Sequence, residues 1–427
     1  MLTPTPTLRK TLAQKLIAQA CARTDVAVGE IVTCDVDLAM FHDSSGPRRL
    51  KPMLEQLRAP LWDTSKIVLV IDHYVPEADD ESRRIVRIAR DWAKEQSLPN
   101  VYDSVGICHV VLPEHGHLRP GMFCVGGDSH SPTGGAFGAY MFGIGSTEML
   151  GVAVSGQIWI KVPETLRMEW RGRLAAGVTA KDMMLHMIGR FGMNGGRYQA
   201  VEFCGEAVAA LSMQERMTLS NMSAEMGAQA GLIAPDSVTL DYLREVGVSD
   251  EIDLARWQGD ADAPAETHRF DAATLAPQIA APHSPANTRD VDAFEDIAVQ
   301  VAYIGACTGA KLDDLRAAAA VLRNRRVAAG VQLVVAPASV RDREAARSEG
   351  VMAILEDAGA EFLATSCGAC SGYGGQIPEN STVISSTARN FKGRMGAETA
   401  KVYLGSPYTV AASALRGRIT DPRKVLS

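Results

Sequence analysis

Short apolar runs that end in polar or glycine-rich loops alternate with helical patterns along most of the sequence. The run Ile67–Ile71 ends at Asp72-His73 and precedes a charged helical pattern over residues 80–96. Residues 299–304 lead in the same way into a glycine-rich loop and an alanine- and leucine-rich helical pattern that ends near Leu322. Further apolar runs cover residues 122–125, 330–335 and 382–386. This repetition predicts an α/β fold with largely parallel sheets, in which ligands bind beyond the carboxyl ends of the strands.

Length and composition set the broad class of protein. The chain has 427 residues, of which 46% are apolar, with a net charge of -7 and a mean hydropathy near zero. These values are typical of a globular protein of about two to four domains, and they exclude disordered, collagen-like and disulfide-scaffold classes. The acidic balance gives no general attraction to nucleic acid. Composition shifts between Gln258 and Asn287, and this stretch is the predicted linker.

The N-terminal segment predicts a helix of a globular protein. Its apolar stretch over residues 16–22 is too short for a secretory signal and fits an amphipathic helix that buries Leu12, Leu16 and Ile17. No run approaches the ~18 apolar residues of a membrane span. We therefore expect a cytoplasmic protein without a membrane partner. Eight cysteines are too sparse for a disulfide framework, so clustered cysteines are candidates for metal binding or catalysis.

Three cysteines lie in glycine-rich loops after apolar runs: Cys307, and the pair Cys367 and Cys370 in the sequence Cys-Gly-Ala-Cys. Thiolates suit zinc and iron–sulfur clusters, and glycine lets backbone N–H groups approach sulfur. Three thiolates rather than four would leave one metal position open, as a Lewis-acid catalyst requires. The alternative is a redox pair at Cys367 and Cys370 with Cys307 as an ordinary buried thiol. Spacing alone does not decide between the two.

Two Asp–His combinations follow apolar runs, at Asp72-His73 and at Asp128-Ser129-His130. An aspartate can orient a histidine, fix its tautomer and raise its basicity, which suits an acid or base near neutral pH. Taken singly, each combination is more often a hydrogen bond within a loop than a catalytic pair.

Arg389 and Arg394 lie five residues apart after the apolar run at residues 382–386. Two guanidinium groups at this spacing could bind a di- or tricarboxylic acid bidentately. In isolation, a solvated basic loop is the simpler interpretation.

Taken together, these motifs resemble those of the aconitase superfamily, and within it the large subunits of the 3-isopropylmalate dehydratase and homoaconitase type. The resemblance covers nearly the whole chain. It implies three domains of α/β/α layers around a central iron–sulfur cluster, expected over residues 1–160, 161–285 and 286–427. The first would carry both Asp/His pairs, and the third would carry the cluster cysteines. The motifs, in chain order, are His42-Asp43-Ser44-Ser45-Gly46-Pro47, Asp72-His73, Gly127-Asp128-Ser129-His130, Glu202-Phe203-Cys204-Gly205, the stretch from Met217 to Glu225, Ile304-Gly305-Ala306-Cys307-Thr308, Cys367-Gly-Ala-Cys370 and the stretch from Arg389 to Arg394.

The resemblance implies one [4Fe–4S] cluster per chain, with Cys307, Cys367 and Cys370 as ligands and one iron open to substrate. It implies a reversible dehydration of a hydroxy acid. Asp72 and His73 would deliver a proton. Asp128 and His130 would hydrogen-bond the substrate hydroxyl or the iron-bound water, with support from His109 and Glu202. The residues expected to hold substrate carboxylates are His42, Ser129, Arg389 and Arg394.

A partner is also implied. Single-chain aconitases carry a swivelling domain with the serine base, whereas this sequence stops at Ser427, about where that domain would begin. We expect the domain on a separate small subunit, in a heterodimer or heterotetramer, and little activity from this chain alone. The first-choice substrate is 3-isopropylmalate, and the alternatives are homoaconitate, citramalate and 2,3-dimethylmalate. Different classes of function are a zinc or thiol enzyme, and a cluster-free RNA-binding regulator, against which the acidic charge counts.

The sequence departs from the family pattern in three places. Thr308-Gly309-Ala310-Lys311 replaces the usual Thr-Asn-Gly-Arg, Ala388 replaces the asparagine before the Arg-Asn-Phe motif, and Ser220 stands where many relatives have cysteine. The first two changes remove amides that could hydrogen-bond cluster sulfurs or substrate. They therefore bear on substrate choice and on the redox properties of the cluster.

Overall fold

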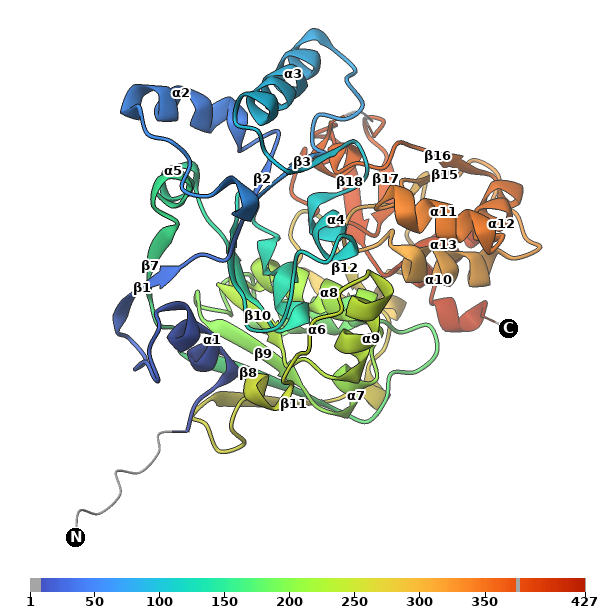
Figure 1. Ribbon diagram of the computed structural model, residues 1–427. Coiled ribbons are helices and arrows are strands. Elements are labelled where there is room, and N and C mark those ends of the chain that lie inside the picture. The colour runs from blue at the N-terminus through green and yellow to red at the C-terminus, as the bar shows by residue number, and fades with distance from the viewer. Residues whose placement is uncertain (1–8, 374–376, 427) are drawn as a thin grey trace.

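A computed structural model describes residues 9–373 and 377–426 of the chain. Figure 1 shows three groups of elements around a common centre: the N-terminal part at the upper left, the middle of the chain below, and the C-terminal part at the right. Three sheets form the frame of these groups, and their strands come from successive stretches of the chain.

The first sheet has five parallel strands in the order β4-β3-β2-β5-β6. Every residue of β2 and β3 is buried, because helices cover parallel sheets on both faces, and this explains their continuous apolar runs. The strand order reverses between β2 and β5. Such a reversal is called a switch point, and open α/β sheets bind ligands there. The strands are β2 (Leu38–His42), β3 (Ile67–Ile71), β4 (Asn100–Asp103), β5 (Phe123–Gly126) and β6 (Tyr140–Gly143).

The second sheet has four parallel strands in the order β10-β9-β8-β11. The third has seven strands in the order β13-β12-β18-β17-β14-β15-β16. Here β12 pairs antiparallel with both β13 and β18, and the other pairs are parallel. Its order reverses between β14 and β17, which creates a second switch point. The strands are β8 (Thr165–Arg171), β9 (Ala200–Cys204), β10 (Ala230–Ile233), β11 (Glu266–Asp271), β12 (Gln278–Ala280), β13 (Thr288–Asp290), β14 (Val301–Ile304), β15 (Gln332–Val335), β16 (Ala360–Phe362), β17 (Thr382–Ser385) and β18 (Lys401–Leu404).

A two-stranded antiparallel ribbon of β1 (Ile31–Asp35) and β7 (Gln157–Lys161) lies apart from these sheets. The α-helices are α1 (Leu12–Ala20), α2 (Pro47–Leu57), α3 (Asp80–Glu95), α4 (Cys108–Glu114), α5 (Ser146–Ser155), α6 (Ala180–Phe191), α7 (Glu206–Ala209), α8 (Met213–Met222), α9 (Ser237–Glu245), α10 (Leu312–Leu322), α11 (Val340–Ser348), α12 (Val351–Ala358) and α13 (Pro407–Arg416). Many begin at a side-chain cap, as α3 does at Asp79, whose carboxylate accepts from Ser82 N–H (2.7 Å).

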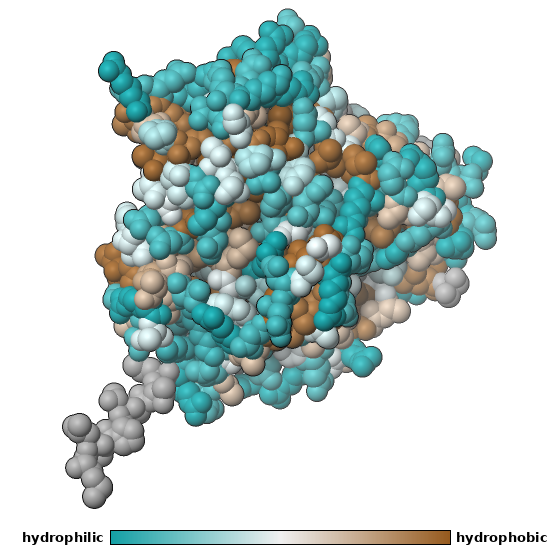
Figure 2. Space-filling view, in the orientation of Figure 1, coloured by the Kyte–Doolittle hydropathy of each residue, from teal (hydrophilic) through white to brown (hydrophobic). Residues whose placement is uncertain are grey.

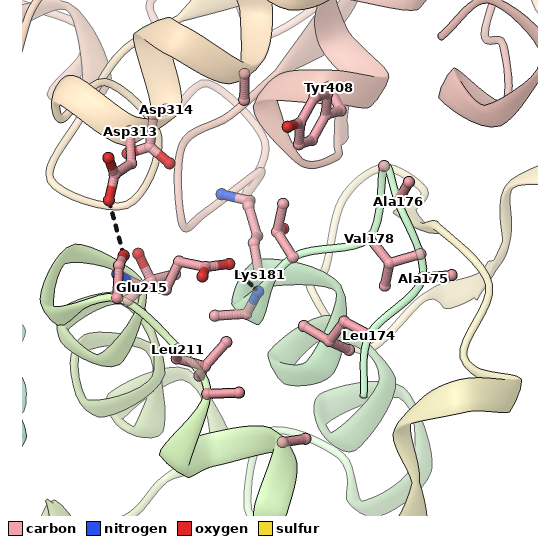
Figure 3. Close-up of a pocket in the computed structure, with 18 of the residues that line it drawn as sticks. Leu174, Ala175, Ala176, Val178, Lys181, Leu211, Glu215, Asp313, Asp314 and Tyr408 are labelled. Atoms are coloured by element: carbon pink, nitrogen blue, oxygen red, sulfur yellow. Dashed lines mark hydrogen bonds between the residues drawn. The ribbon is translucent and has the colours of Figure 1, made fainter. Parts of the chain in front are cut away.

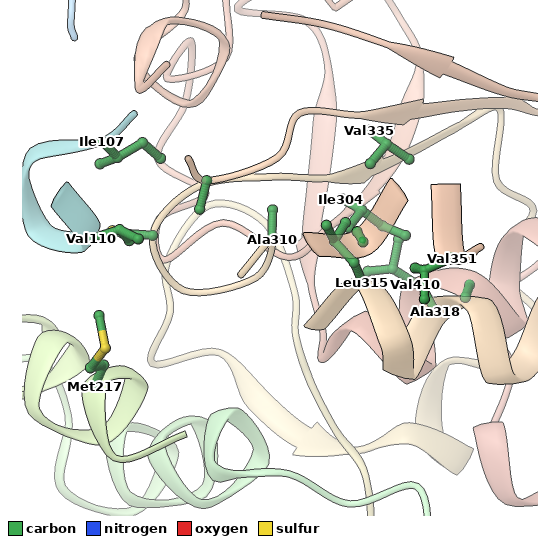
Figure 4. Packing of buried hydrophobic residues seen from close by; sticks show 14 of the residues in the cluster. Ile107, Val110, Met217, Ile304, Ala310, Leu315, Ala318, Val335, Val351 and Val410 are labelled. Carbon is green, nitrogen blue, oxygen red and sulfur yellow. The ribbon is translucent and has the colours of Figure 1, made fainter. Parts of the chain in front are cut away.

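One buried hydrophobic cluster joins elements of all three sheet regions. It includes Ile107 just before α4, Met217 of α8, and Leu315 and Val410 of α10 and α13. Figure 4 shows these residues on elements that converge from three sides. The three regions therefore share one core, and this fixes the relative positions of the loops at their sheet edges.

The α/β class and the largely parallel sheets are confirmed. The predicted strands correspond to β3, β5, β14, β15 and β17, and the predicted helices correspond to α1, α3 and α10. Leu12, Leu16 and Ile17 of α1 are buried, as expected. Among the residues described, no helix combines the length and the apolar character needed to cross a membrane.

The linker predicted between Gln258 and Asn287 does contain the connection between two sheets, but it is not irregular throughout. It contains β11, which closes one side of the second sheet, and β12, which belongs to the third. The chain passes from one sheet to the next within Ala272–Pro277. The low periodicity that suggested a linker reflects two short strands, one of them at a sheet edge, with few buried residues in β11.

A partly buried carboxyl group at the junction of the three regions gives the first prediction. Glu114 at the end of α4 accepts a hydrogen bond from Ser339 Oγ (2.5 Å) of the third region. Burial, and then the charge of Asp342, raise the pKa of Glu114 to about 8. An unfolded glutamate has a pKa of about 4.3, so the folded state binds the proton more tightly, and this stabilisation is lost as pH rises toward 8. Glu114→Gln should match the wild type at pH 5 and be more stable at pH 9, by on the order of 3 kcal/mol.

Thermal unfolding of both proteins at pH 5, 7 and 9 checks this expectation. Glu356→Gln, which replaces an exposed glutamate of α12, is the control and should follow the wild type at every pH. Equal destabilisation of Glu114→Gln at pH 5 and pH 9 would show that the carboxyl group stays ionised in the folded protein.

Candidate active site

The candidate site lies where the switch points of the first and third sheets meet. His42 ends β2, and the Asp128 loop follows β5, on the two sides of the first switch point. Cys307 follows β14 and Arg389 follows β17, on the two sides of the second. Two hydrogen bonds join these edges: Cys367 N–H donates to Asp72 O (3.0 Å), and Arg389 Nη2 donates to Ser129 Oγ (2.9 Å).

Asp72 and His73 form a buried ion pair at the end of β3. Asp72 Oδ1 lies 2.7 Å from His73 Nδ1, and Asp72 Oδ2 accepts from Cys108 N–H (2.7 Å). Asp43 fixes the loop, because its carboxylate accepts from the backbone N–H groups of His73 (3.1 Å) and Tyr74 (2.8 Å). Burial would lower the pKa of His73, but the carboxylates of Asp72 and Asp128 raise it well above its usual range. His73 is therefore a protonated imidazolium near neutral pH, able to donate a proton from Nε2.

His42 stacks on His73 with ring centroids 4.0 Å apart. Burial, and then the charge of His73, lower the pKa of His42 to about 4. Its Nε2 lies 2.8 Å from Ser45 Oγ and 3.0 Å from Gly127 O. The two stacked rings therefore differ in protonation, with a neutral ring beside a charged one.

Asp128 is the centre of a second group. Its Oδ1 lies 2.7 Å from His109 Nε2 and accepts from His130 N–H (2.8 Å), and its Oδ2 lies 3.7 Å from His73 Nε2. Although burial would raise the pKa of Asp128, His109 and His73 lower it well below the usual range. Asp128 thus stays ionised and links the two Asp/His pairs into one array.

Glu225 connects this array to the arginine loop. Its Oε1 lies 2.8 Å from His130 Nε2 and accepts from Arg389 Nε (2.7 Å). Glu225 is buried, and burial would raise its pKa, but the hydrogen bond from His130 and the charge of Arg389 lower it. Burial and Arg389 lower the pKa of His130. Arg389 is therefore held between Glu225 and Ser129, with its guanidinium positioned at the site.

The three cysteines lie on two loops of the third sheet, and Cys370 is near enough to influence the pKa of Cys307. Cys367 precedes the short 3-10 helix Gly368–Ser371, which carries Cys370, and Cys307 lies after β14 beside Ala306, whose φ is +70°. A hydrogen bond with Cys367, and the guanidinium groups of Arg394 and Arg389, lower the pKa of Cys370 to about 6. Burial raises the pKa of Cys307 to about 12.

The surroundings of these thiols suit a metal group bound by thiolates. Asn221 Nδ2 lies 3.2 Å from Cys307 Sγ, where it donates to the sulfur. Arg394 Nε is buried and has no hydrogen-bond partner within the described ranges. An amide donor at one sulfur and a guanidinium charge beside another stabilise thiolate ligands. The unpartnered Nε of Arg394 fits an anionic group bound next to it.

Comparison with known proteins identifies the group to which this chain belongs. The model of the Aconitase family (aconitate hydratase) matches residues 14–296 and 287–417. The chain belongs to the aconitase family. Its activity is therefore that of a hydro-lyase, and the α/β sheets and the site described above are those of a member of this family.

Curated relatives are similar over nearly their full length. The probable 3-isopropylmalate dehydratase large subunit of Methanothermobacter thermautotrophicus is 42% identical over 415 residues, which cover 96% of this chain and 98% of the relative. The 3-isopropylmalate dehydratase large subunit 1 of Methanopyrus kandleri is 41% identical over 98% of this chain and 100% of its own. The probable methanogen homoaconitase large subunit of Methanosarcina mazei is 42% identical over 92% and 99%.

The structure corrects one of the predicted site residues of this aconitase-family chain. Glu202 does not join the acid–base array: it lies within β9, and its Oε1 accepts from Ala13 N–H (3.2 Å) at the start of α1. Arg167 is its nearest cation, at 3.9 Å. The carboxylate that supports His130 is Glu225. The other predicted residues lie at or beside the two switch points, and their roles remain predictions.

Sequence reasoning missed Asn221, Glu225 and Asp43 as site residues, although all three lie in motifs already singled out. Asn221 and Glu225 are four residues apart, on α8 and the 3-10 turn that follows it, so they can reach one region from one side of the segment. The sequence signal that could have revealed them is the run of polar residues in α8, which has no clear polar face. Its meaning depends on burial, since the last seven residues of α8 are all buried.

Local packing explains two of the departures from the family pattern. A Cβ on Gly309 would lie 2.3 Å from the Cβ of Ser386, so an asparagine there would require Ser386 to move. Ser386 Oγ is fixed by Gly305 N–H (2.9 Å) and Gly309 O (3.1 Å). Ala388 is buried in a hydrophobic cluster, where an amide would need a new partner. Nothing in the structure explains Ser220, whose Oγ has no partner within the described ranges.

In the loop that carries Cys307, a lysine replaces the family arginine. This lysine binds the backbone of the loop. Lys311 Nζ donates to Cys307 O (3.0 Å) and to Thr218 Oγ1 (3.0 Å), and it pairs with Asp314 (2.8 Å). Lys181 likewise donates to Thr387 O (2.7 Å) in the arginine loop. Two buried lysine side chains therefore position the two loops without entering the array.

A cavity of about 670 Å³ lies beyond these lysines, between α6–α8 and α10 and α13 (Figure 3). None of the predicted site residues lines it. Its acidic groups already have partners: Asp313 accepts from Ser212 Oγ (2.7 Å), and Glu215 accepts from Ala180 N–H (3.3 Å). The site is therefore at the meeting of the sheet edges and not in this cavity.

Proposed function

We propose that this chain is the catalytic large subunit of a hydro-lyase that reversibly dehydrates 3-isopropylmalate. The observation that carries the proposal is the ion pair of Asp72 and His73, which holds an imidazolium 3.7 Å from Asp128 and beside the cysteine loops. The names of the most similar relatives support the substrate, and the homoaconitase relative at equal identity makes a homoaconitate the second candidate.

Cys307, Cys367 and Cys370 would hold a [4Fe–4S] cluster. When bound, the cluster would supply a Lewis acid at the iron that has no cysteine ligand, which suits the departure of a hydroxyl group. Asn221 would donate to the sulfur of Cys307, and Arg394 would balance the negative charge of the thiolates. These contacts would favour the anionic form of the ligands.

The residues of this chain would then bind the acid and deliver a proton. Arg389, oriented by Glu225, would hold one carboxylate of the substrate, with Ser129 beside it. His73 would protonate the leaving hydroxyl from Nε2, and Asp72 would stabilise the imidazolium before that transfer. Asp128 would accept a hydrogen bond from the hydroxyl or from water.

The base that removes the carbon-bound proton would come from a small subunit that carries the swivelling domain. The relatives are called large subunits, and this chain spans 98–100% of the length of the first two. A proton acceptor from a second chain would complete the site, in a heterodimer or heterotetramer.

Turnover of a panel of acids tests the proposal. With its small subunit, the chain should dehydrate 3-isopropylmalate with a kcat/KM at least about ten-fold above that for homocitrate, citramalate or 2,3-dimethylmalate. Formation of the unsaturated acid is followed by ultraviolet absorbance, under anaerobic conditions. The chain alone should be slower by about a thousand-fold or more, because it lacks the base.

Each other outcome has a defined meaning. Preference for homocitrate would assign the homoaconitase activity instead. Full activity of the chain alone would overturn the small-subunit proposal. Failure to turn over any of the four acids, with cluster and partner both present, would overturn the proposed substrate class.

A further inference from the structure

The β1–β7 ribbon and the loops beside it expose an unusual concentration of large hydrophobic side chains. Trp159 is 68% exposed, Ile31 66% and Tyr198 62%, and Val28 is half exposed. These four, which we call the ribbon patch, are four of the six large hydrophobic side chains that the described residues leave exposed. Grouped exposure of this kind marks an interaction surface, whereas single exposed residues are common.

The ribbon patch surrounds a hollow. A cavity of about 660 Å³ is lined by Val28, Trp159 and Tyr198 together with Phe142 and Ile160. Figure 2 shows hydrophobic surface at the left edge of the molecule, where Figure 1 places β1 and β7. The ribbon packs through its other face, where Val32, Cys34 and Ile160 are buried, and Ile160 also forms part of the inner wall of the hollow. The exposed face is therefore not needed to hold the ribbon in the fold.

The charges at the rim of the hollow are unpaired. Lys161, Glu148 and Glu164 line it, and none forms an ion pair with any residue in the ranges 9–373 and 377–426. In contrast, Arg197 at the same rim pairs with Glu266. One unpaired cation and two unpaired carboxylates on one patch are complementary to the same patch on another molecule.

We propose that the ribbon patch joins two copies of this chain about a two-fold axis. A two-fold interface brings one patch against its own copy, so the patch must contain both a projecting group and a space to receive it. The ribbon patch has both, because Trp159 projects beside the hollow. The same pairing brings Lys161 of each copy toward the carboxylates of the other. None of the predicted site residues lines this hollow, so the surface is separate from the one that a partner completing the site must cover.

Sedimentation of the full chain, alone and with its small subunit, tests the proposal. The wild type should form a dimer of large chains at micromolar concentration. Trp159→Glu should raise the dimer dissociation constant by about a hundred-fold or more, because it places a charge in the buried centre of the interface. Leu57→Glu, at an exposed leucine of α2, should leave it unchanged. Circular dichroism of both variants checks that each is folded.

A charge reversal identifies the occupant as a second copy. Lys161→Glu should weaken self-association, and so should the double change Glu148→Lys with Glu164→Lys. A mixture of these two proteins should form mixed dimers as readily as the wild type forms its own. In a mixed dimer the negative patch of one variant faces the positive patch of the other.

Three results would overturn the proposal. These are a monomeric wild type, a Trp159→Glu protein that dimerises normally, and a Trp159→Glu protein that loses only the small subunit. The last would assign the patch to the small subunit.

Discussion

Cys307→Ser should abolish assembly of the iron–sulfur cluster and reduce turnover by about a thousand-fold or more. Cys307 comes from a different loop than Cys367 and Cys370. Its loss therefore leaves two thiolates on one turn and no thiolate from the other loop. After anaerobic reconstitution, the wild type should contain about four irons and four sulfides per chain, with the matching absorbance. The variant should contain few of either.

Cys124→Ser is the matched control for this experiment. Cys124 is as fully buried as Cys307 but lies within β5, among apolar neighbours. Cys124→Ser should lower the free energy of unfolding but leave the iron and sulfide content unchanged. Zinc in place of iron and sulfide, lost in Cys307→Ser, would leave the family membership intact and would assign the zinc or thiol chemistry instead. Full iron content in Cys307→Ser would remove Cys307 from the ligand set.

The sequence was sufficient for five of the strands, β3, β5, β14, β15 and β17, and for the polar loops that follow them. Runs such as Ile67–Ile71 are buried on both faces, so their apolar character is continuous and easily read. The polar residues just after them necessarily lie at the carboxyl edge of a parallel sheet. For this reason Asp72, His73, Asp128 and Cys307 could be named before the structure was known.

The sequence was not sufficient to decide which carboxylate within a helix or strand belongs to the site. Glu202 is a strand residue, and successive strand side chains point to opposite faces. Which face meets the site depends on how the second sheet packs on the first, and here Glu202 turns toward α1. Glu225 reaches His130 because α8, which directly precedes the turn that carries Glu225, packs against the 3-10 helix Ser131–Phe137. Both facts belong to tertiary packing, and no local pattern contains them.

Glu225→Gln should lower kcat by about a hundred-fold with the cluster still present. The Glu225 carboxylate joins His130 at 2.8 Å and Arg389 at 2.7 Å, so its charge holds both a histidine of the acid–base array and the guanidinium that we propose to bind a carboxylate. A neutral amide keeps the shape but cannot accept from both with the same strength. We also expect KM to rise, because Arg389 loses the partner that orients it. Steady-state kinetics of the reconstituted enzyme with its small subunit measure both constants.

Glu202→Gln provides the contrast that decides which glutamate belongs to the site. Its amide oxygen can still accept from Ala13 N–H, so kcat should stay within about three-fold of the wild type, and any effect should be a lower temperature of unfolding. Iron content, measured for both variants, separates loss of catalysis from loss of the cluster. A large drop in kcat for Glu202→Gln, with normal kinetics for Glu225→Gln, would contradict the geometry of the site and restore the assignment made from the sequence. Similar losses for both would mean that α1 and β9 transmit strain to the acid–base array, since Glu202 itself touches none of its residues in the part of the chain described.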